Sequence, residues 1–107
     1  MYKWQTSGMV RAVAGFDWDV GNLAKCRKHG VSLAEIESLF EGSPRIAPDL
    51  KHSATEDRRI AVGRGASGRA LFVAFVFRMV DGTLRIRPIT ARYMHSKEVE
   101  AYEKESP

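Results

Sequence analysis

The sequence predicts an α+β fold: two N-terminal helices packed on an antiparallel sheet of three to four strands, with a short C-terminal helix. Two segments with helix-end signals come first, and a hydrophobic three-stranded meander follows between Glu56 and Tyr93. Helices that precede a run of strands, instead of alternating with them, are typical of this class. The length of 107 residues is that of one domain. We expect residues 16-105 to form this domain and residues 1-15 to be an N-terminal extension.

The first helix is expected from Val20 to Lys28. Asp19 can cap its N-terminus, because a short carboxylate accepts a hydrogen bond from the first turn, and Gly30 can end it. The apolar residues predicted to face inward are Val20, Leu23 and Ala24.

The second helix is predicted from Leu33 to Glu41. Ser32 and Glu35 have the S-x-x-E spacing of a capping box, in which each side chain accepts a hydrogen bond from the backbone amide of the other residue. Val31 and Ile36 have the spacing of a hydrophobic staple across the same helix end.

Three strands are expected at 57–64, 70–78 and 84–93, from their alternation and their β-branched and aromatic residues. The turn Asp81-Gly82 separates the last two strands, and Pro88 indicates a bulge or a free edge. The middle strand is apolar on both faces, so both faces should be covered.

Two further elements flank the meander. A short edge strand is expected at 45–47, between two prolines. The last segment, from Ser96 to Glu105, is expected to be an acidic helix whose inward residues are Val99 and Tyr102.

The composition narrows the function. A single cysteine, Cys26, excludes an intrachain disulfide, and we interpret it as a small core residue of a protein from a reducing cytoplasm. The longest apolar run, at 70–77, is too short to span a bilayer. The three histidines and Cys26 show no paired ligand spacing, so no metal site and no cofactor are expected. A net charge of +4 favours an anionic partner.

The strongest feature is a set of arginines within the meander. Arginine grips phosphate with a planar fork and stays charged, so an RNA-binding surface is one interpretation. The alternative is a solvated sheet face whose arginines pair with Glu56, Asp57 and the acidic tail, and the charge pattern leaves both open. The set comprises Arg58, Arg59, Arg64, Arg69, Arg78, Arg85, Arg87 and Arg92.

Alternation along the first strand of the meander separates its arginines. Arg59 shares a face with Ala61 and Gly63, whose small size predicts an open surface there. Arg58 and Arg64 fall on the opposite face and should lie at its two ends.

Such a surface could cleave RNA without a metal ion. The ribose 2′-hydroxyl can attack the adjacent phosphate when a base accepts its proton and cations stabilise the transition state. His52 or Glu56 could be the base, and Tyr93 or a histidine could donate a proton to the leaving oxygen.

Several motifs, taken in order, resemble those of the BrnT family of bacterial toxins from type II toxin–antitoxin systems. The similarity runs from Phe16 to about Tyr102. The matching motifs are Phe16-x-Trp18-Asp19, Lys28-His29-Gly30-Val31-Ser32, His52-Ser53-x-x-Glu56-x-Arg58, Gly63-Arg64, Gly68-Arg69 and Ile89-Thr90-Ala91-Arg92.

The resemblance implies a RelE-like fold and a ribonuclease that blocks translation. It also implies neutralisation by a cognate ribbon-helix-helix antitoxin (BrnA-like), through which alone the complex would contact operator DNA. The matching positions that it marks as active are Lys28, His29, His52, Glu56, Arg58, Arg64 and Arg92.

Together with the arginine pattern, these positions give the expected site of a metal-independent endoribonuclease. The alternative function is a non-catalytic basic interaction module that binds a partner protein or RNA. The expected catalytic residues are His52, Glu56, Arg64 and Arg92. The expected RNA-binding residues are Lys28, His29, Arg58, Arg59, Arg69, Arg87 and Tyr93.

Overall fold

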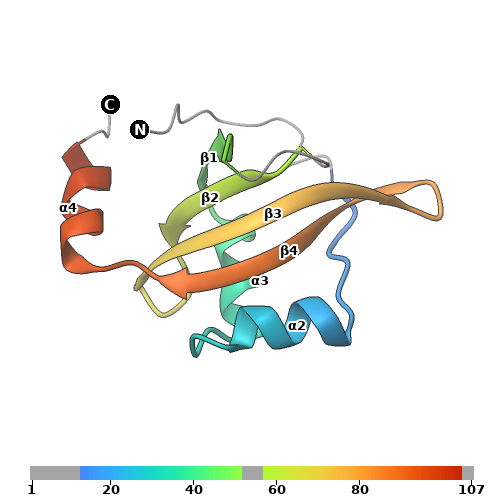
Figure 1. Ribbon diagram of the computed structural model, residues 1–107, viewed down its shortest axis with the longest axis horizontal. Coiled ribbons are helices and arrows are strands. Elements are labelled where there is room, and N and C mark those ends of the chain that lie inside the picture. Colours follow the sequence, from blue (N-terminus) through green and yellow to red (C-terminus); the bar gives the residue numbers. More distant parts are fainter. Residues whose placement is uncertain (1–12, 52–56, 105–107) are drawn as a thin grey trace.

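The computed structural model describes residues 13–51 and 57–104 of the chain. Two helices, a sheet and a closing helix follow one another as predicted, so the α+β fold is confirmed (Figure 1). The helices are α2 (Val20–Arg27), α3 (Leu33–Glu41) and α4 (Ser96–Lys104). The strands are β1 (Arg45–Pro48), β2 (Arg59–Arg64), β3 (Ala70–Val80) and β4 (Thr83–Tyr93).

The four strands form one antiparallel sheet in the order β1-β2-β3-β4. The expected edge strand is therefore present as β1. The predicted turn joins β3 to β4, and φ angles of 50° at Asp81 and 79° at Gly82 suit the tight turn of a two-residue hairpin. Helix α3 packs on β2 and β3, whereas α2 runs beside β4 (Figure 1).

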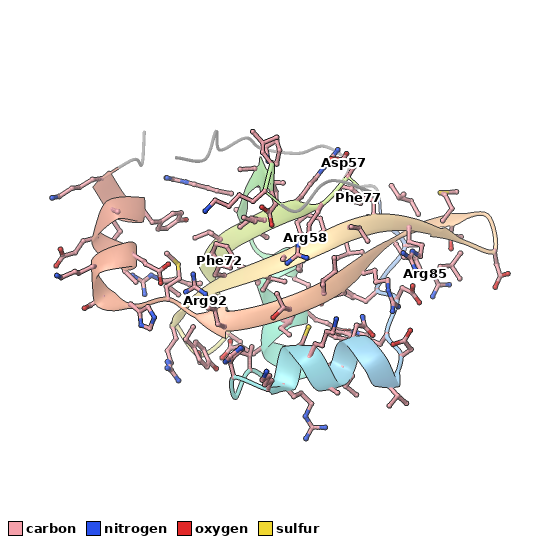
Figure 2. All side chains as sticks on the ribbon, in the orientation of Figure 1. Asp57, Arg58, Phe72, Phe77, Arg85 and Arg92 are labelled. Carbon is pink, nitrogen blue, oxygen red and sulfur yellow. The ribbon has the colours of Figure 1, made fainter. Side chains whose placement is uncertain are left out.

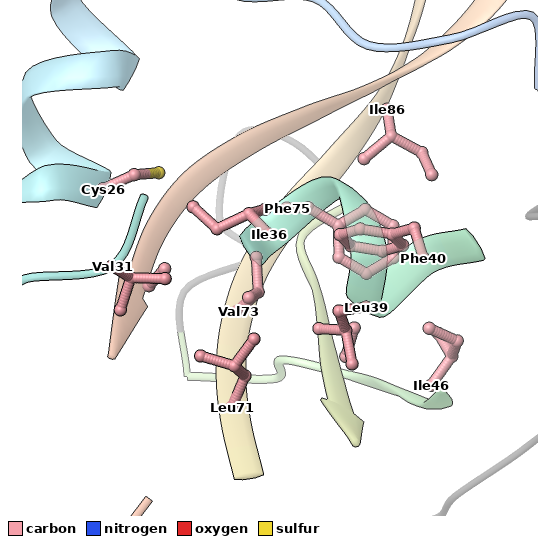
Figure 3. Packing of buried hydrophobic residues seen from close by; sticks show 12 residues of the cluster. Cys26, Val31, Ile36, Leu39, Phe40, Ile46, Leu71, Val73, Phe75 and Ile86 are labelled. Atoms are coloured by element: carbon pink, nitrogen blue, oxygen red, sulfur yellow. The ribbon is translucent and has the colours of Figure 1, made fainter. Parts of the chain in front are cut away.

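The core lies between α3 and the sheet. Ile36, Leu39 and Phe40 extend from α3 toward Val73 and Phe75 of β3, as Figure 3 shows. The Phe40 and Phe75 rings meet edge-to-face at 5.0 Å, the geometry that the aromatic quadrupole favours. These contacts fix α3 against the middle of the sheet.

The middle of strand β3 is buried on both faces, as its sequence predicts. Val73 and Phe75, which point toward α3, have no exposed surface. Ala74 and Val76, which point the other way, are also buried. The prediction that both faces of this strand are covered is therefore confirmed.

The expectation of an open surface beside Ala61 and Gly63 is wrong. Both residues are buried on the face that α3 covers. A Cβ at position 63 would lie 2.9 Å from Cδ1 of Leu39 and 3.4 Å from Cα of Pro44. Small residues mark the place where the helix approaches the sheet most closely, because there is no room for a larger side chain.

The predicted inward stripe of α2 is wrong for Val20 and Ala24, whereas Leu23 is half-buried, and the helix and its Asp19 cap are present. Val20 is 86% exposed and Ala24 is exposed, whereas Asn22 and Cys26 are buried. Because α2 lies along the edge strand β4, only a narrow side of the helix is buried. Asn22 lies on this side, and its side-chain amide donates hydrogen bonds to two backbone carbonyls. The interpretation of Cys26 as a core residue is confirmed, and burial raises the pKa of its thiol to about 11.

The outer edge of β4 is covered by the chain before α2. The Ala14 amide donates to the Leu84 carbonyl at 2.8 Å, and the Ile86 amide donates to Gly15 at 3.0 Å. Phe16 pairs with Ile86 as a parallel bridge. The domain boundary at residue 15 stays a prediction, but Ala14 and Gly15 already hydrogen-bond to the sheet.

The predicted irregularity at Pro88 is present as a register shift opposite Ala74 and Phe75 of β3. Pro88 has no amide hydrogen to give to a ladder, and its carbonyl accepts from Nδ2 of Asn22 at 2.8 Å. The same Nδ2 donates to the Asp17 carbonyl at 3.0 Å, and Oδ1 of Asn22 accepts from the Asp19 amide at 2.7 Å. One buried amide thus joins the start of α2 to the bulge of β4.

Replacement of Asn22 by alanine is expected to lower the free energy of unfolding by about 2 kcal/mol, because the buried carbonyl of Pro88 and the partly buried backbone groups of Asp17 and Asp19 lose their partner. Chemical denaturation of wild type and Asn22→Ala measures the change, and Lys25→Ala, on the exposed side of α2, is the control. Equal stability of the two variants would contradict this role of Asn22.

Candidate nucleic-acid interface

Four of the predicted site residues meet at one end of the sheet, where the β2–β3 turn lies beside the C-terminal end of β4. We call this region the arginine end; it comprises Arg64, Arg69, Arg92 and Tyr93. In the strand register, Arg64 is opposite Ala70, Leu71 is opposite Tyr93, and Phe72 is opposite Arg92. Figure 2 shows Arg92 beside Phe72 at this end, with Arg85 toward the opposite end of β4.

The arginine end has two sides, because successive residues of a strand point to opposite faces. Tyr93 packs against the core beneath α3, and the Arg69 guanidinium lies over its ring. Arg64 and Arg92 point to the other face, toward α4. We refer to these as the α3 side and the α4 side.

On the α3 side, Glu35 joins three elements. Its Oε1 accepts from the Ser67 amide in the β2–β3 turn at 3.1 Å, and its Oε2 accepts from the Tyr93 hydroxyl at 3.2 Å. The predicted capping box is half wrong: Ser32 does accept from the Glu35 amide at 3.1 Å, but the Glu35 carboxylate is turned toward the sheet. Gly65 leaves the space for it, since a Cβ there would overlap Oε1 of Glu35.

This network sets the charge of its members. Hydrogen bonds from the side chain and backbone of Ser67 hold the pKa of Glu35 below its ordinary value, and Tyr93 and Arg69 act in the same direction. Burial, followed by the hydrogen bond to Glu35, raises the pKa of Tyr93. Glu35 is therefore an anion and Tyr93 a neutral phenol at neutral pH.

The Arg69 guanidinium carbon lies 3.5 Å from the centre of the Tyr93 ring. Arg69 is exposed, so the stack of a guanidinium on a phenol ring borders solvent. Planar cations in this position are attracted by the electron-rich face of the ring. The α3 side thus presents a flat, cationic group that a fixed tyrosine supports.

On the α4 side, Arg92 forms a two-point ion pair with Glu98. Nη1 to Oε1 is 2.7 Å and Nη2 to Oε2 is 2.8 Å. The Arg92 guanidinium also lies over the Phe72 ring, 4.4 Å from its centre. Arg92, more than any other cause, lowers the pKa of Glu98, to about 2, and the His95 amide also donates to Glu98, at 2.9 Å.

Arg64 is fixed in a similar way. Its Nη1 donates to the Gly68 carbonyl at 2.8 Å, and its Nη2 lies 3.3 Å from Oε1 of Glu103 in α4. Both expected catalytic arginines therefore contact carboxylates of α4. These contacts agree with the alternative prediction in which the acidic tail pairs with the arginines.

Helix α4 is only loosely packed. Its described residues include none that is buried, and the predicted inward residues Val99 and Tyr102 are half-buried. Arg45 of β1 lies over the Tyr102 ring, 4.7 Å from its centre. Charge and ring contacts, rather than a hydrophobic interface, hold this helix against the sheet.

The remaining predicted arginines lie away from the arginine end. Nε of Arg58 lies 3.2 Å from Oδ2 of Asp49, and Nη2 of Arg59 lies 2.7 Å from Oδ2 of Asp57. Arg87 pairs with both Asp17, at 3.2 Å, and Asp19, at 2.7 Å. RNA-binding roles for Arg58, Arg59 and Arg87 stay predictions.

Lys28 and His29 are exposed where α2 ends and the chain turns toward α3. Figure 1 shows this connection at the same end of the sheet as the β2–β3 turn. His52 and Glu56, expected to be catalytic, lie outside the described residues. In residues 13–51 and 57–104, no group of His, Cys, Asp and Glu side chains could hold a metal ion.

Reasoning from the sequence missed Glu35 as a site residue. Its helix-capping spacing explained the residue locally, and only the fold brings the β2–β3 turn and Tyr93 to its carboxylate. In the part of the chain that the structure describes, no helix is long and apolar enough to cross a membrane.

Comparison with known protein families matches residues 18–98 to the ribonuclease toxin BrnT of type II toxin–antitoxin systems. The matched range includes α2, α3, the whole sheet and every residue of the arginine end. A search of curated proteins gave no match.

The ion pair of Arg92 and Glu98 is expected to make the stability of the fold depend on pH in the acidic range. With a folded-state pKa of about 2, below the ordinary 4.5, Glu98 stabilises the fold above about pH 4.5, and this contribution is lost as the pH falls toward 2. Thermal unfolding of wild type and Glu98→Gln between pH 7 and 2 tests this: the gap between them should be largest at neutral pH and close in acid.

Glu100→Gln is the control, because Glu100 is an exposed residue of the same helix. A gap between wild type and Glu98→Gln that persists unchanged at pH 2 would contradict the effect of the ion pair.

Proposed function

The chain belongs to the BrnT family of ribonuclease toxins of type II toxin–antitoxin systems, and from this premise we propose that it cleaves RNA without a metal ion, by attack of a ribose 2′-hydroxyl on the adjacent phosphodiester. The observation that carries the proposal is the pairing of Arg64 and Arg92 with carboxylates on the α4 side of the arginine end. Both guanidinium groups already bind anionic oxygens there.

The reaction needs a base, an acid and positive charge. The base removes the 2′-hydroxyl proton, the bond from O2′ to phosphorus forms, and the bond from phosphorus to O5′ breaks as the acid protonates O5′. The products are a 2′,3′-cyclic phosphate and a 5′-hydroxyl. Negative charge grows on the phosphate oxygens in the transition state, where Arg64 and Arg92 would stabilise it.

Arg92 is suited to this task because its fork fits two oxygens at once. Glu98 now presents two oxygens at 2.7 and 2.8 Å, and a phosphate can present a similar pair. The ion pair is partly exposed, so its exchange for a phosphate costs little. RNA would therefore replace Glu98 on Arg92.

The base and the acid have separate candidates. His52 and Glu56 remain the expected candidates for the base. Tyr93 faces α3 and its hydroxyl donates a hydrogen bond to Oε2 of Glu35, so we assign Tyr93 to RNA binding rather than to proton donation. His95 is exposed, follows β4 and is close enough to Glu98 to lower its pKa, so His95 is the candidate acid among the described histidines.

Cleavage of RNA would block translation, the expected effect of such a toxin. The type II system implies a cognate protein antitoxin. We propose that this antitoxin is a ribbon-helix-helix protein, BrnA-like, and that the complex contacts operator DNA only through it.

The ribonuclease activity is tested by incubating purified protein with total RNA in excess chelator. We expect fragments with 2′,3′-cyclic phosphate ends, and about a hundredfold slower cleavage for Arg92→Ala and Arg64→Ala, the loss typical for one charge-stabilising group. Arg85→Ala removes an arginine from the far end of the same strand as Arg92 and should cleave like wild type.

Intact RNA at high protein concentration would contradict the proposal and favour the alternative of a non-catalytic basic interaction module. Equal cleavage by all three variants would show that the activity does not use the arginine end.

The antitoxin is tested by co-expression with the product of the neighbouring reading frame. A short ribbon-helix-helix protein from that frame should co-purify with the chain, restore growth and stop RNA cleavage. Growth arrest that the neighbouring protein does not relieve would contradict the proposed partner.

A further inference from the structure

We propose that Glu35 is a positioning residue that holds the stacked Arg69 and Tyr93 side chains as a nucleobase-binding platform. The inference rests on the proposed ribonuclease function and extends it to the α3 side of the arginine end. The class of ligand is single-stranded RNA, one base of which would stack on the exposed face of the Arg69 guanidinium.

The first support is the position of the Glu35 carboxylate. One oxygen receives the Ser67 amide of the β2–β3 turn, and the other receives the Tyr93 hydroxyl at the end of β4. Glu35 itself lies in the first turn of α3, where the helix dipole favours an anion. One carboxylate therefore sets the turn and the tyrosine ring relative to each other.

The second support is a parallel clamp from the same helix. The Ala66 amide donates to Oγ of Ser38 at 2.8 Å, and this hydroxyl donates to the Glu35 carbonyl at 2.6 Å. Two side chains of α3 thus hold two successive amides of the β2–β3 turn. Arg69 leaves this turn directly, so its backbone is fixed close to Tyr93.

The third support is the geometry of the stack. At 3.5 Å from the ring centre, the Arg69 guanidinium lies in van der Waals contact with Tyr93, and the residue is exposed. Unpaired RNA bases stack on aromatic rings and on arginine planes. Because Glu35 holds the phenol oxygen, the ring loses little further freedom when a base binds.

The platform also fits the arginines on the other side. Arg64 is the last residue of β2, and Arg69 is the last of the five residues that connect β2 to β3. Arg64 also donates to the Gly68 carbonyl within this connection. An RNA strand that crosses this rim would place a phosphate on the α4 side and a neighbouring base on the α3 side. Exposed Lys28 and His29, at the end of α2, lie at the same end of the sheet.

The test uses the full chain, a short RNA substrate and the same sequence with 2′-O-methyl groups, which binds but cannot be cut. We expect Glu35→Gln, Tyr93→Phe and Arg69→Lys each to weaken binding of the methylated RNA by about fivefold or more, the low end of one lost base stack. KM for cleavage should rise by the same factor with kcat nearly unchanged, because the platform binds RNA without touching the reacting phosphate.

Two further measurements separate positioning from folding or charge. Arg69→Lys keeps the positive charge but removes the planar guanidinium. Glu41→Gln is the control for Glu35→Gln: it is the same substitution at an exposed position of α3, and it should bind RNA like wild type. Replacement of Tyr2 and Tyr102 by phenylalanine leaves Tyr93 as the only tyrosine, so that an alkaline absorbance titration reports its pKa. In this background Glu35→Gln should lower the pKa of Tyr93, because the Glu35 carboxylate raises it.

Two results would overturn the platform while RNA cleavage by the wild type stands: wild-type binding by Arg69→Lys, or a fall in kcat at constant KM in Glu35→Gln. If Glu35→Gln does not fold, the exposed substitution Arg69→Lys still decides. A wild-type chain that neither binds nor cuts RNA would overturn the proposed function, and the platform with it.

Discussion

The hydrogen bonds of the Glu35 carboxylate are the constraint on which the arrangement of the arginine end depends. They join the first turn of α3, the β2–β3 turn and the last residue of β4. The pKa of Glu35 is lowered by the same donors, so the anion persists at neutral pH and the network stays intact. The positions of Tyr93 and of the turn that carries Arg69 therefore depend on one largely buried carboxylate.

The arginines on the two sides of the arginine end have different partners. On the α3 side, the guanidinium of the exposed residue Arg69 lies over a neutral phenol ring. On the α4 side, Arg64 and Arg92 are paired with Glu103 and Glu98. Helix α4 buries none of its described residues, and these ion pairs are among the few contacts that join it to the sheet. RNA binding on that side would compete directly with the position of the helix.

Local signals predicted the elements, and long-range contacts decided what the sequence could not. The capping residues Asp19 and Ser32 predicted the starts of both N-terminal helices. The alternation of apolar and polar residues, together with the turn at Asp81-Gly82, predicted the meander. Small residues at Ala61 and Gly63 were misread as open surface, because size alone does not tell a solvent face from one that a helix approaches. Asn22 and Glu35 were missed for a related reason: each has the spacing of a local helix-capping residue, while side-chain partners lie 66 residues from Asn22 and 58 residues from Glu35.

The central claim is that RNA binds at the arginine end of the sheet. NMR spectra of the arginine side-chain N–H groups, recorded during titration with non-cleavable single-stranded RNA, test it most directly. The account predicts shifts for Arg64, Arg69 and Arg92, with Arg92 changing as it leaves Glu98, and none for Arg85 at the far end of β4. Unchanged signals from those three arginines, with shifts at Arg85 instead, would contradict it.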